Sequence, residues 1–170
     1  MSSSSIVIET ERLILRRFSL DDAAFILGLL NEPSFLRFVG DKGVRNLDDA
    51  RDYLVKGPIA SYEQHGFGLL LTLLKDGEVP IGMCGLLKRE VLDDVDVGFA
   101  FLPQFWSKGY AFESASAVVS YGKRVFGRDR IVGLVKPDNQ GSIRVLQKMG
   151  MKFEKMVRFA ADGTEDKLFA

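Results

Sequence analysis

The segment from Val95 to Leu102 restricts the possible folds of this chain more than any other, because large and small side chains alternate along it. Four large apolar residues alternate with three small or polar residues: Val95, Val97, Phe99 and Phe101 against Asp96, Gly98 and Ala100. Successive side chains of a β-strand point to opposite faces, so the pattern predicts a strand whose large face covers a hydrophobic core. The small face is expected to leave room for a ligand to approach the backbone.

Further strands are predicted on both sides of this segment. The turn dipeptide Asp76-Gly77 stands between two apolar runs, which indicates an antiparallel hairpin. The strands expected are 12–16, 68–74, 80–87, 95–102, 130–135 and the two arms of a final hairpin that turns at Asp162-Gly163. A chain with this order of elements is expected to be α+β, with a largely antiparallel sheet and helices on its faces.

Helices are predicted from their caps and from apolar residues at helical spacing. Ser19 is expected to cap a first helix that Pro33 ends, and Gly57-Pro58 is expected to break or kink a second helix over 47–64. A long helix is expected over 108–126 and a short one over 140–149, which Gly150 ends. The long helix is expected to bury one face: Ala111, Ala115, Val118, Gly122 and Val125.

Length and composition exclude several classes of protein. The 170 residues favour a single domain over residues 6–170 behind a flexible N-terminus at 1–5. The 23 basic and 23 acidic residues cancel, so there is no overall positive charge to attract nucleic acid. One cysteine, Cys84, and one histidine, His65, argue against a disulfide and a zinc site, and no metal is expected. No apolar run is long enough to span a membrane, and a cytoplasmic location is expected.

The segment of residues 101–113 carries the most specific signal for function. Gly109 is predicted in the first turn of the long helix, where its missing Cβ lets a ligand reach the free backbone N–H groups. A helix N-terminus with the adjacent cation Lys108 favours a phosphate group. The segment lacks the glycine patterns of a P-loop and of a dinucleotide-binding fold. Taken alone, a glycine at this position is also consistent with a simple turn.

Three sequence blocks resemble the GNAT superfamily of acyl-CoA-dependent N-acyltransferases, and within it the branch of ribosomal-protein N-terminal acetyltransferases. Trp106-Ser107-Lys108-Gly109-Tyr110-Ala111 matches that branch's Trp-Gly-Lys-Gly-Tyr-Ala at five of six positions, with Ser107 in place of the first glycine, and Glu113 also fits. Residues 139–153 resemble its Asn-X-X-Ser-X-X-X-Leu-X-Lys-X-Gly-Phe signature, and the opening at 9–16 is typical of it. The resemblance implies a mixed, mostly antiparallel twisted sheet of about six to seven strands with splayed central strands.

The resemblance also implies that acetyl-CoA binds as a co-substrate. Its pantetheine arm would pair with the backbone of the strand at 96–102, and its pyrophosphate would lie on the N–H groups at 106–111. Asn139 would hold the pantetheine or the reacting centre, and Arg144 and Lys148 would meet the outer phosphates, unless these two cations form only a solvated helix face. The residues assigned to the cofactor are Phe99, Phe101, Leu102, Trp106, Ser107, Lys108, Gly109, Tyr110, Ala111, Asn139, Ser142, Arg144 and Lys148.

Two residues are assigned to catalysis on the same basis. Asp96 is the candidate general base, with the alternative that it only positions a cationic amine. Leu146 stands where many members of the superfamily have a tyrosine that protonates the thiolate, so Ser142 is the candidate acid. The alternative for Ser142 is a first-turn residue that satisfies backbone donors. A backbone N–H near Phe101 would stabilise the oxyanion.

The expected activity is transfer of an acetyl group from acetyl-CoA to a primary amine, with no covalent enzyme intermediate. The acceptor would be a protein N-terminus or a small amine, with no nucleic-acid or membrane partner, and the protein would be a monomer or a homodimer. The alternative is a non-catalytic acyl-CoA-binding or interaction module with the same fold. Ser107 and Leu146, which depart from the family pattern, keep that alternative open.

Overall fold

The computed structural model describes residues 5–158 and 163–170. The expected N-terminal segment, apart from Ser5, and Asp162 of the expected C-terminal turn lie outside the described residues. The strands are β1 Ile6–Glu9, β2 Leu13–Arg17, β3 Leu69–Leu74, β4 Val79–Leu87, β5 Val95–Phe101, β6 Ile131–Val135, β7 Phe153–Arg158 and β8 Glu165–Phe169. The helices are α1 Ala23–Leu30, α2 Pro33–Phe38, α3 Leu47–Leu54, α4 Ala60–His65, α5 Tyr110–Phe126 and α6 Gln140–Lys148.

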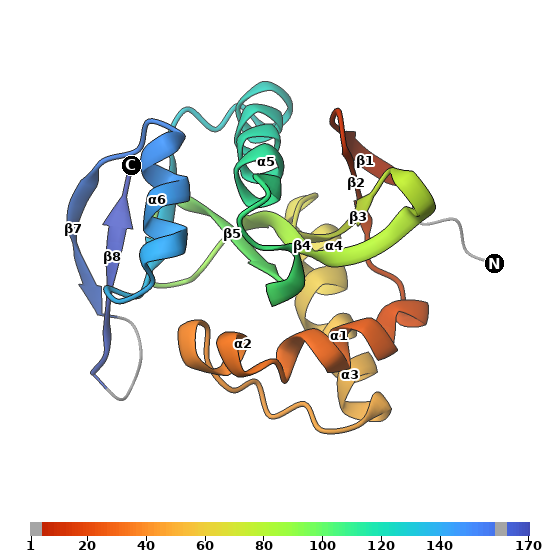
Figure 1. The fold of residues 1–170 in the computed structure, drawn as a ribbon. Helices are drawn as coiled ribbons and strands as arrows, with labels where there is room; N and C mark the ends of the chain where they lie inside the picture. The colour runs from red at the N-terminus through yellow and green to blue at the C-terminus, as the bar shows by residue number, and fades with distance from the viewer. Residues whose placement is uncertain (1–4, 159–162) are drawn as a thin grey trace.

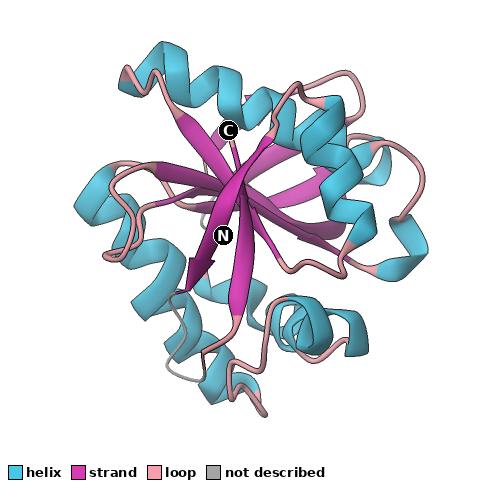
Figure 2. Cartoon of the chain, turned by 90° about the vertical axis from the view of Figure 1, so that its left-hand side faces the viewer, coloured by secondary structure: helices cyan, strands magenta, loops and turns pink. Residues whose placement is uncertain are grey.

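The described strands form one sheet in the order β1-β2-β3-β4-β5-β6-β8-β7, and the α+β class is confirmed. Every neighbouring pair is antiparallel except β5 and β6, which run parallel. Figure 2 shows the strands fanned by a strong twist, with helices around them. The sheet has eight strands, one more than the upper expectation, because the four residues of β1 pair with β2.

The two parallel strands splay apart, as expected from the resemblance. Their ladder joins residues 95–97 of β5 to residues 131–133 of β6 and stops there. On its other side, β5 stays paired with β4 as far as Phe101. The last four residues of β5 therefore have ladder partners on one side only, and the sheet opens at the carboxyl ends of β5 and β6.

Helices cover both faces of the sheet (Figure 1). α5 packs on the face that carries Val95, Val97 and Phe101, so the expected large face of β5 does cover a core. The opposite face packs against α1 and α3. The expected buried face of α5 needs one correction: Val125 is 50% exposed, whereas Ser114 is fully buried.

The small side of β5 is less open than expected. A Cβ atom on Gly98 would lie 2.9 Å from a methyl group of Leu87, so the glycine makes room for a neighbouring leucine. Ala100, two residues later, lies where the sheet has opened and lines the cleft described below. Space for a ligand therefore begins after Gly98.

In the N-terminal helices the expected cap is present, but the two prolines do not break the helices as expected. Ser19 caps the first helical stretch as expected, in a capping box with Asp22, and α1 follows. Pro33 does not end this helix but begins α2. The N–H group of a first helical residue has no partner within the helix, so proline, which lacks this group, is well suited to that position. Gly57-Pro58 does not break the second helical stretch either: the chain passes through them as a π-helical turn, residues 55–59, between α3 and α4.

Candidate active site

A cleft of about 720 Å³ lies at the open end of the sheet, where β5, α5, α6 and α2 meet. The end of β5 and the start of α5 form one wall, and one side of α6, with the residues that precede it, forms the second. α2 forms the third wall from the opposite face of the sheet. The cleft thus connects the two sides of the sheet through the gap between β5 and β6.

The start of α5 presents backbone donors to this cleft. The first bond within the helix runs from the Glu113 N–H to the Gly109 carbonyl, at 3.0 Å. The N–H groups of Tyr110, Ala111 and Phe112 precede it and have no partner within the helix. Gly109 is the N-cap rather than a first-turn residue, and its φ of 86° is one that glycine adopts without strain. These donors and the positive end of the helix dipole suit an anionic group.

Ser107, which replaces a glycine of the family motif, also has a left-handed backbone, with φ of 60°. A side chain in this conformation costs about 1–2 kcal/mol relative to the right-handed regions. The loop therefore retains a backbone shape suited to glycine although the sequence has lost the glycine. Ser107 lines the cleft together with Trp106, whose indole Nε1–H donates to the Phe101 carbonyl at 2.8 Å.

The start of α6 contributes the second wall. The Oδ1 atom of Asn139 accepts a hydrogen bond from the Ser142 backbone N–H at 3.2 Å, so Asn139 is the N-cap of the helix and also lines the cleft. Leu146 does not reach the cleft: it is 2% exposed, and its methyl groups fill the space beside Gly133. This position of α6 therefore belongs to the core and provides no proton donor.

The two cations assigned to the outer phosphates lie on the cleft side of α6. The Arg144 Nε–H donates to the Gln140 carbonyl at 3.4 Å, and the Lys148 Nζ lies 4.3 Å from the centre of the Phe112 ring on α5. The contact between Lys148 and Phe112 joins α6 to α5 beside the helix N-terminus. Both cations therefore add positive charge to the α6 wall, and Lys148 does so next to the start of α5.

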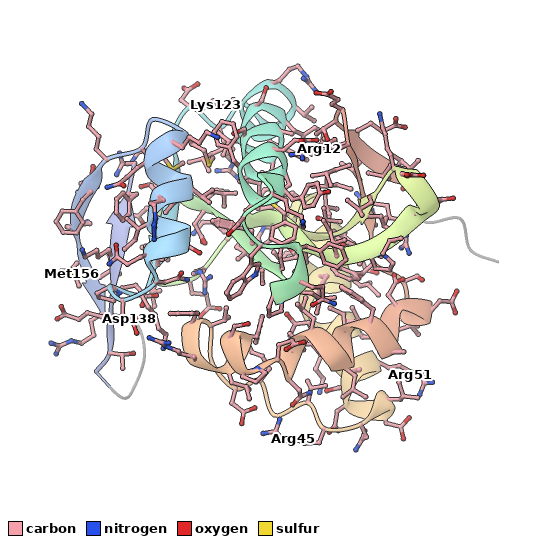
Figure 3. All side chains as sticks on the ribbon, in the orientation of Figure 1. Arg12, Arg45, Arg51, Lys123, Asp138 and Met156 are labelled. Carbon is pink, nitrogen blue, oxygen red and sulfur yellow. The ribbon has the colours of Figure 1, made fainter. Side chains whose placement is uncertain are left out.

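α2 forms an aromatic and apolar wall across from these cations. Phe35 and Phe38 line the cleft there with Val39. Arg37, also on α2, forms an ion pair of 3.2 Å with Asp138, which precedes α6. In Figure 3 the labelled Asp138 lies at the end of α6 that is nearest α2. This ion pair connects two walls of the cleft.

Asp96 lies near the bottom of the opening but does not line the cleft. Its side chain is 2% exposed, and its Oδ1 accepts a hydrogen bond from the Arg89 Nε–H at 3.1 Å. Burial raises the pKa of the Asp96 carboxyl above its ordinary value, and the charge of Arg89 offsets part of this effect. Asp96 is therefore a buried carboxyl that holds a proton more readily than an exposed aspartate does.

The structure brings together most of the residues assigned to the site from sequence. The cleft is lined by Phe99, Phe101, Trp106, Ser107, Gly109, Tyr110, Ala111, Asn139, Ser142, Arg144 and Lys148. Three assigned residues lie outside the lining: Asp96, Leu102 and Lys108. Leu102 donates its backbone N–H to the Ile81 carbonyl at 2.9 Å, and Lys108 is exposed with its carbonyl turned to Arg12 at 2.9 Å.

The resemblance implied that the early helices, which include Phe35 and Phe38, wall the acceptor site, although most of their aromatics were expected to be core. Phe35 and Phe38 do line the cleft. Arg37 and Asp138 were not singled out from the sequence. No local signal identifies them, because their position at the cleft depends on how α2 folds back toward α6. Tyr62, another aromatic of those helices, is buried in the core under α5.

Comparisons with known proteins agree with this geometry. Residues 12–152 match the family model described as acetyltransferase (GNAT) domain. The uncharacterized N-acetyltransferase YoaA of Bacillus subtilis is 30% identical over 154 residues, which cover 89% of this chain and 86% of that protein. YkkB of the same organism, an uncharacterized protein, is 31% identical and covers 88% and 87%. The chain therefore belongs to the GNAT acetyltransferase family.

Solved structures share the fold. An acetyltransferase from Agrobacterium tumefaciens has a TM-score of 0.82 at 21% identity, covering 99% of this chain and 95% of that one. RimL, a ribosomal L7/L12 alpha-N-protein acetyltransferase in complex with coenzyme A, has a TM-score of 0.83 at 17% identity, covering 97% and 96%. No helix among the described residues has both the length and the apolar character needed to cross a membrane.

Proposed function

We propose that this protein transfers the acetyl group of acetyl-CoA to a primary amine, by direct attack and without a covalent enzyme intermediate. The observation that carries the proposal is the opening between β5 and β6 beside the start of α5, where no side chain caps the helix. An extended ligand arm fits the unpaired edge of β5, and an anionic group fits the N–H groups that follow Gly109. These are the two parts that a coenzyme A molecule offers.

In this proposal different residues around the cleft bind different parts of acetyl-CoA. The loop from Trp106 to Gly109 and the first turn of α5 bind the pyrophosphate, and the edge of β5 from Phe99 to Phe101 pairs with the pantetheine arm. Bound acetyl-CoA supplies an activated thioester carbonyl. Asn139 orients the arm from the other wall, and Arg144 and Lys148 balance the charge of the outer phosphates.

Two proton transfers are assigned to residues of this chain. The acceptor amine must lose a proton before it attacks, and Asp96, a carboxyl with a raised pKa, is the proposed base. Because Asp96 is buried beside Arg89, it would act through a water molecule or position the amine. Ser142 lines the cleft and is the proposed donor to the departing thiolate, since Leu146 lies in the core.

The charge of the cleft narrows the class of acceptor. Among the described residues that line it, Asp138 is the one carboxylate, and it is already paired with Arg37. A polyamine or an aminoglycoside carries several positive charges and needs several carboxylates to replace its hydration. The α2 wall instead offers Phe35 and Phe38. We therefore propose an acceptor with a single amine next to an apolar group, as a protein N-terminus or a small monoamine provides.

The test incubates purified protein with acetyl-CoA and an acceptor panel, and measures free thiol and the mass of the products. The panel contains peptides with small or apolar first residues, small monoamines, a polyamine and an aminoglycoside. Transfer to the peptides or monoamines is the expected result. Transfer only to the polycations would contradict the acceptor class. Calorimetric binding of acetyl-CoA without transfer to any acceptor would favour the non-catalytic alternative, which the loss of a tyrosine at Leu146 supports.

A further inference from the structure

Arg12, which directly precedes β2, makes several contacts with the loop that starts α5. Its Nε–H donates to Oε1 of Glu113 at 2.7 Å, and its backbone N–H donates to Oε2 of the same carboxylate at 2.9 Å. One terminal nitrogen donates to the Lys108 carbonyl at 2.9 Å, and the guanidinium lies 4.5 Å from the centre of the Tyr110 ring. Thr10 adds a hydrogen bond of 2.5 Å from its hydroxyl to Oε2 of Glu113.

These five residues, Thr10, Arg12, Lys108, Tyr110 and Glu113, are called the Arg12 network below. It joins segments about a hundred residues apart: the β1–β2 connection and the start of α5, between which the labelled Arg12 lies in Figure 3. The Arg12 and Glu113 side chains are 43% and 19% exposed, so the carboxylate is mostly enclosed while the guanidinium reaches the surface. The two ends of the network are the two sequence blocks, 9–16 and 106–113, that resemble the family.

Arg12 contacts the turn at Gly109 but does not itself line the cleft. A Cβ atom on Gly109 would lie 3.2 Å from a terminal nitrogen of Arg12, so the guanidinium packs directly against this turn. Residues Lys108 and Tyr110, on either side of the glycine, both contact the same guanidinium. The planar guanidinium of Arg12 thus packs against the left-handed turn at Gly109 and contacts the residues on both sides of it.

The Arg12 network also holds the negative charge of the Glu113 carboxylate. Glu113 lies in the first turn of α5, directly after the three residues with free N–H groups, and an anion there competes with a phosphate for the same positive helix end. Burial raises the pKa of Glu113, but hydrogen bonds from Thr10 and from the backbone and side chain of Arg12 lower it below its ordinary value, so the carboxylate is charged. The guanidinium of Arg12 places a full positive charge beside this carboxylate.

We propose that Arg12 is a positioning residue for the co-substrate: it holds the Lys108–Tyr110 turn in the shape that exposes the α5 N–H groups, and it screens Glu113 from the pyrophosphate. This inference rests on the proposed function. In this inference the N-terminal segment contributes to acetyl-CoA binding although it does not contact the co-substrate. Arg12 is therefore expected to affect the affinity for acetyl-CoA, and not the chemical step.

The first experiment measures acetyl-CoA binding by calorimetry for the wild type and for Arg12→Met, Arg12→Lys and Arg130→Met. Arg130 is a matched control: its side chain is 45% exposed and also pairs with carboxylates from two distant segments, Asp94 and Glu154. We expect affinity to fall about tenfold in Arg12→Met, the size of a lost charge-assisted hydrogen bond, and about threefold in Arg12→Lys, which keeps the charge without the fork. Arg130→Met is expected to bind as the wild type does.

The second experiment separates screening from simple loss of structure. In Glu113→Gln/Arg12→Met no unscreened carboxylate remains, so its affinity is expected to recover about threefold relative to Arg12→Met alone, a non-additive result. In steady-state kinetics Arg12→Met is expected to raise the KM for acetyl-CoA about tenfold while kcat and the KM for the acceptor stay within twofold. A structural defect alone would lower kcat, or the active fraction, with every substrate.

The outcomes distinguish the two proposals. If the wild type does not bind acetyl-CoA, both the proposed function and this inference are overturned. If the wild type binds but Arg12→Met binds equally well, or no more weakly than Arg130→Met, only the inference fails. Additive effects in the double variant would overturn the screening role. If Arg12→Lys shows a normal thermal transition but binds acetyl-CoA as weakly as Arg12→Met does, the charge of residue 12 has no part in binding.

Discussion

The carboxylate of Asp96 and the guanidinium of Arg89 form a hydrogen-bonded ion pair of 3.1 Å, one residue before the point where β5 and β6 separate. Asp96 is nearly fully buried, whereas the Arg89 side chain is 38% exposed. The pair gives a buried acid a charged neighbour that reaches solvent. A proton taken up by Asp96 therefore changes the charge balance beside the proposed reaction centre.

The first prediction concerns the pH dependence of the reaction in Asp96→Asn. Burial raises the pKa of Asp96, and a base works only in its deprotonated form, so the wild-type rate should fall as the pH drops through this raised pKa. Asn cannot take the proton, so the variant should lose this acidic limb and react about 10²–10⁴ times more slowly. Initial rates over a pH series, at saturating substrates, measure both effects.

Asp94→Asn is the matched control, because Asp94 is two residues away and pairs with Arg130 at the surface. It should keep the wild-type profile. If Asp96→Asn is slower but shows the same acidic limb, Asp96 positions the amine and does not accept its proton. An unchanged rate would remove Asp96 from the reaction altogether.

The second prediction tests the anion site with Gly109→Glu. The side chain would bring bulk and a negative charge to the start of α5, where the pyrophosphate is proposed to bind, and binding of coenzyme A should be lost in calorimetry at micromolar protein. Gly127 caps the other end of the same helix with φ of 62°, so Gly127→Glu imposes similar backbone strain. That control should be destabilised but should bind coenzyme A. Equal affinities in Gly109→Glu and the wild type would place the pyrophosphate elsewhere.

The third prediction concerns the strain at Ser107. Its left-handed backbone should relax in Ser107→Gly, and after allowance for the more flexible unfolded chain the free energy of unfolding should rise by about 0.5–1 kcal/mol. Glu78 has φ of 49° in the connection between β3 and β4, and Glu78→Gly should stabilise by a similar amount. Denaturant titrations of the three proteins give the values. A loss of stability in Ser107→Gly would mean that the serine side chain makes contacts worth more than the strain.

The parts of the fold that the sequence predicted have local causes. The alternation of β5, the Ser19 cap and the Asp76-Gly77 turn each depend on a few adjacent residues, and each was found in the structure. Pro33 was misassigned because proline ends one helix and begins the next with equal ease. β1 was missed because four residues carry too little periodicity to predict a strand without its partner.

The site shows the same division. The loop at 106–111 and the start of α6 could be found because they resemble family motifs, in which particular residues stand at a fixed spacing. The Arg37–Asp138 and Arg12–Glu113 pairs could not, since each joins residues 101 positions apart. Gly98 was misread for a related reason: the pattern showed a small residue, but only the packing shows that Leu87 fills the space.

The fourth prediction separates the two tasks of Asn139, which caps α6 and is proposed to hold the pantetheine arm. Asn139→Ala removes both the Oδ1 acceptor and the amide donor, so the free energy of unfolding should fall by about 1 kcal/mol and activity should fall as well. Asn139→Asp keeps an oxygen for the Ser142 N–H and loses only the donor, so stability should stay near the wild-type value while kcat/KM falls at least about tenfold. Asn46 caps α3 in the same way, away from the cleft, and Asn46→Ala should lose the same stability with activity unchanged. Full activity in Asn139→Asp would show that the amide donor has no part in the reaction and would leave Asn139 with its cap alone.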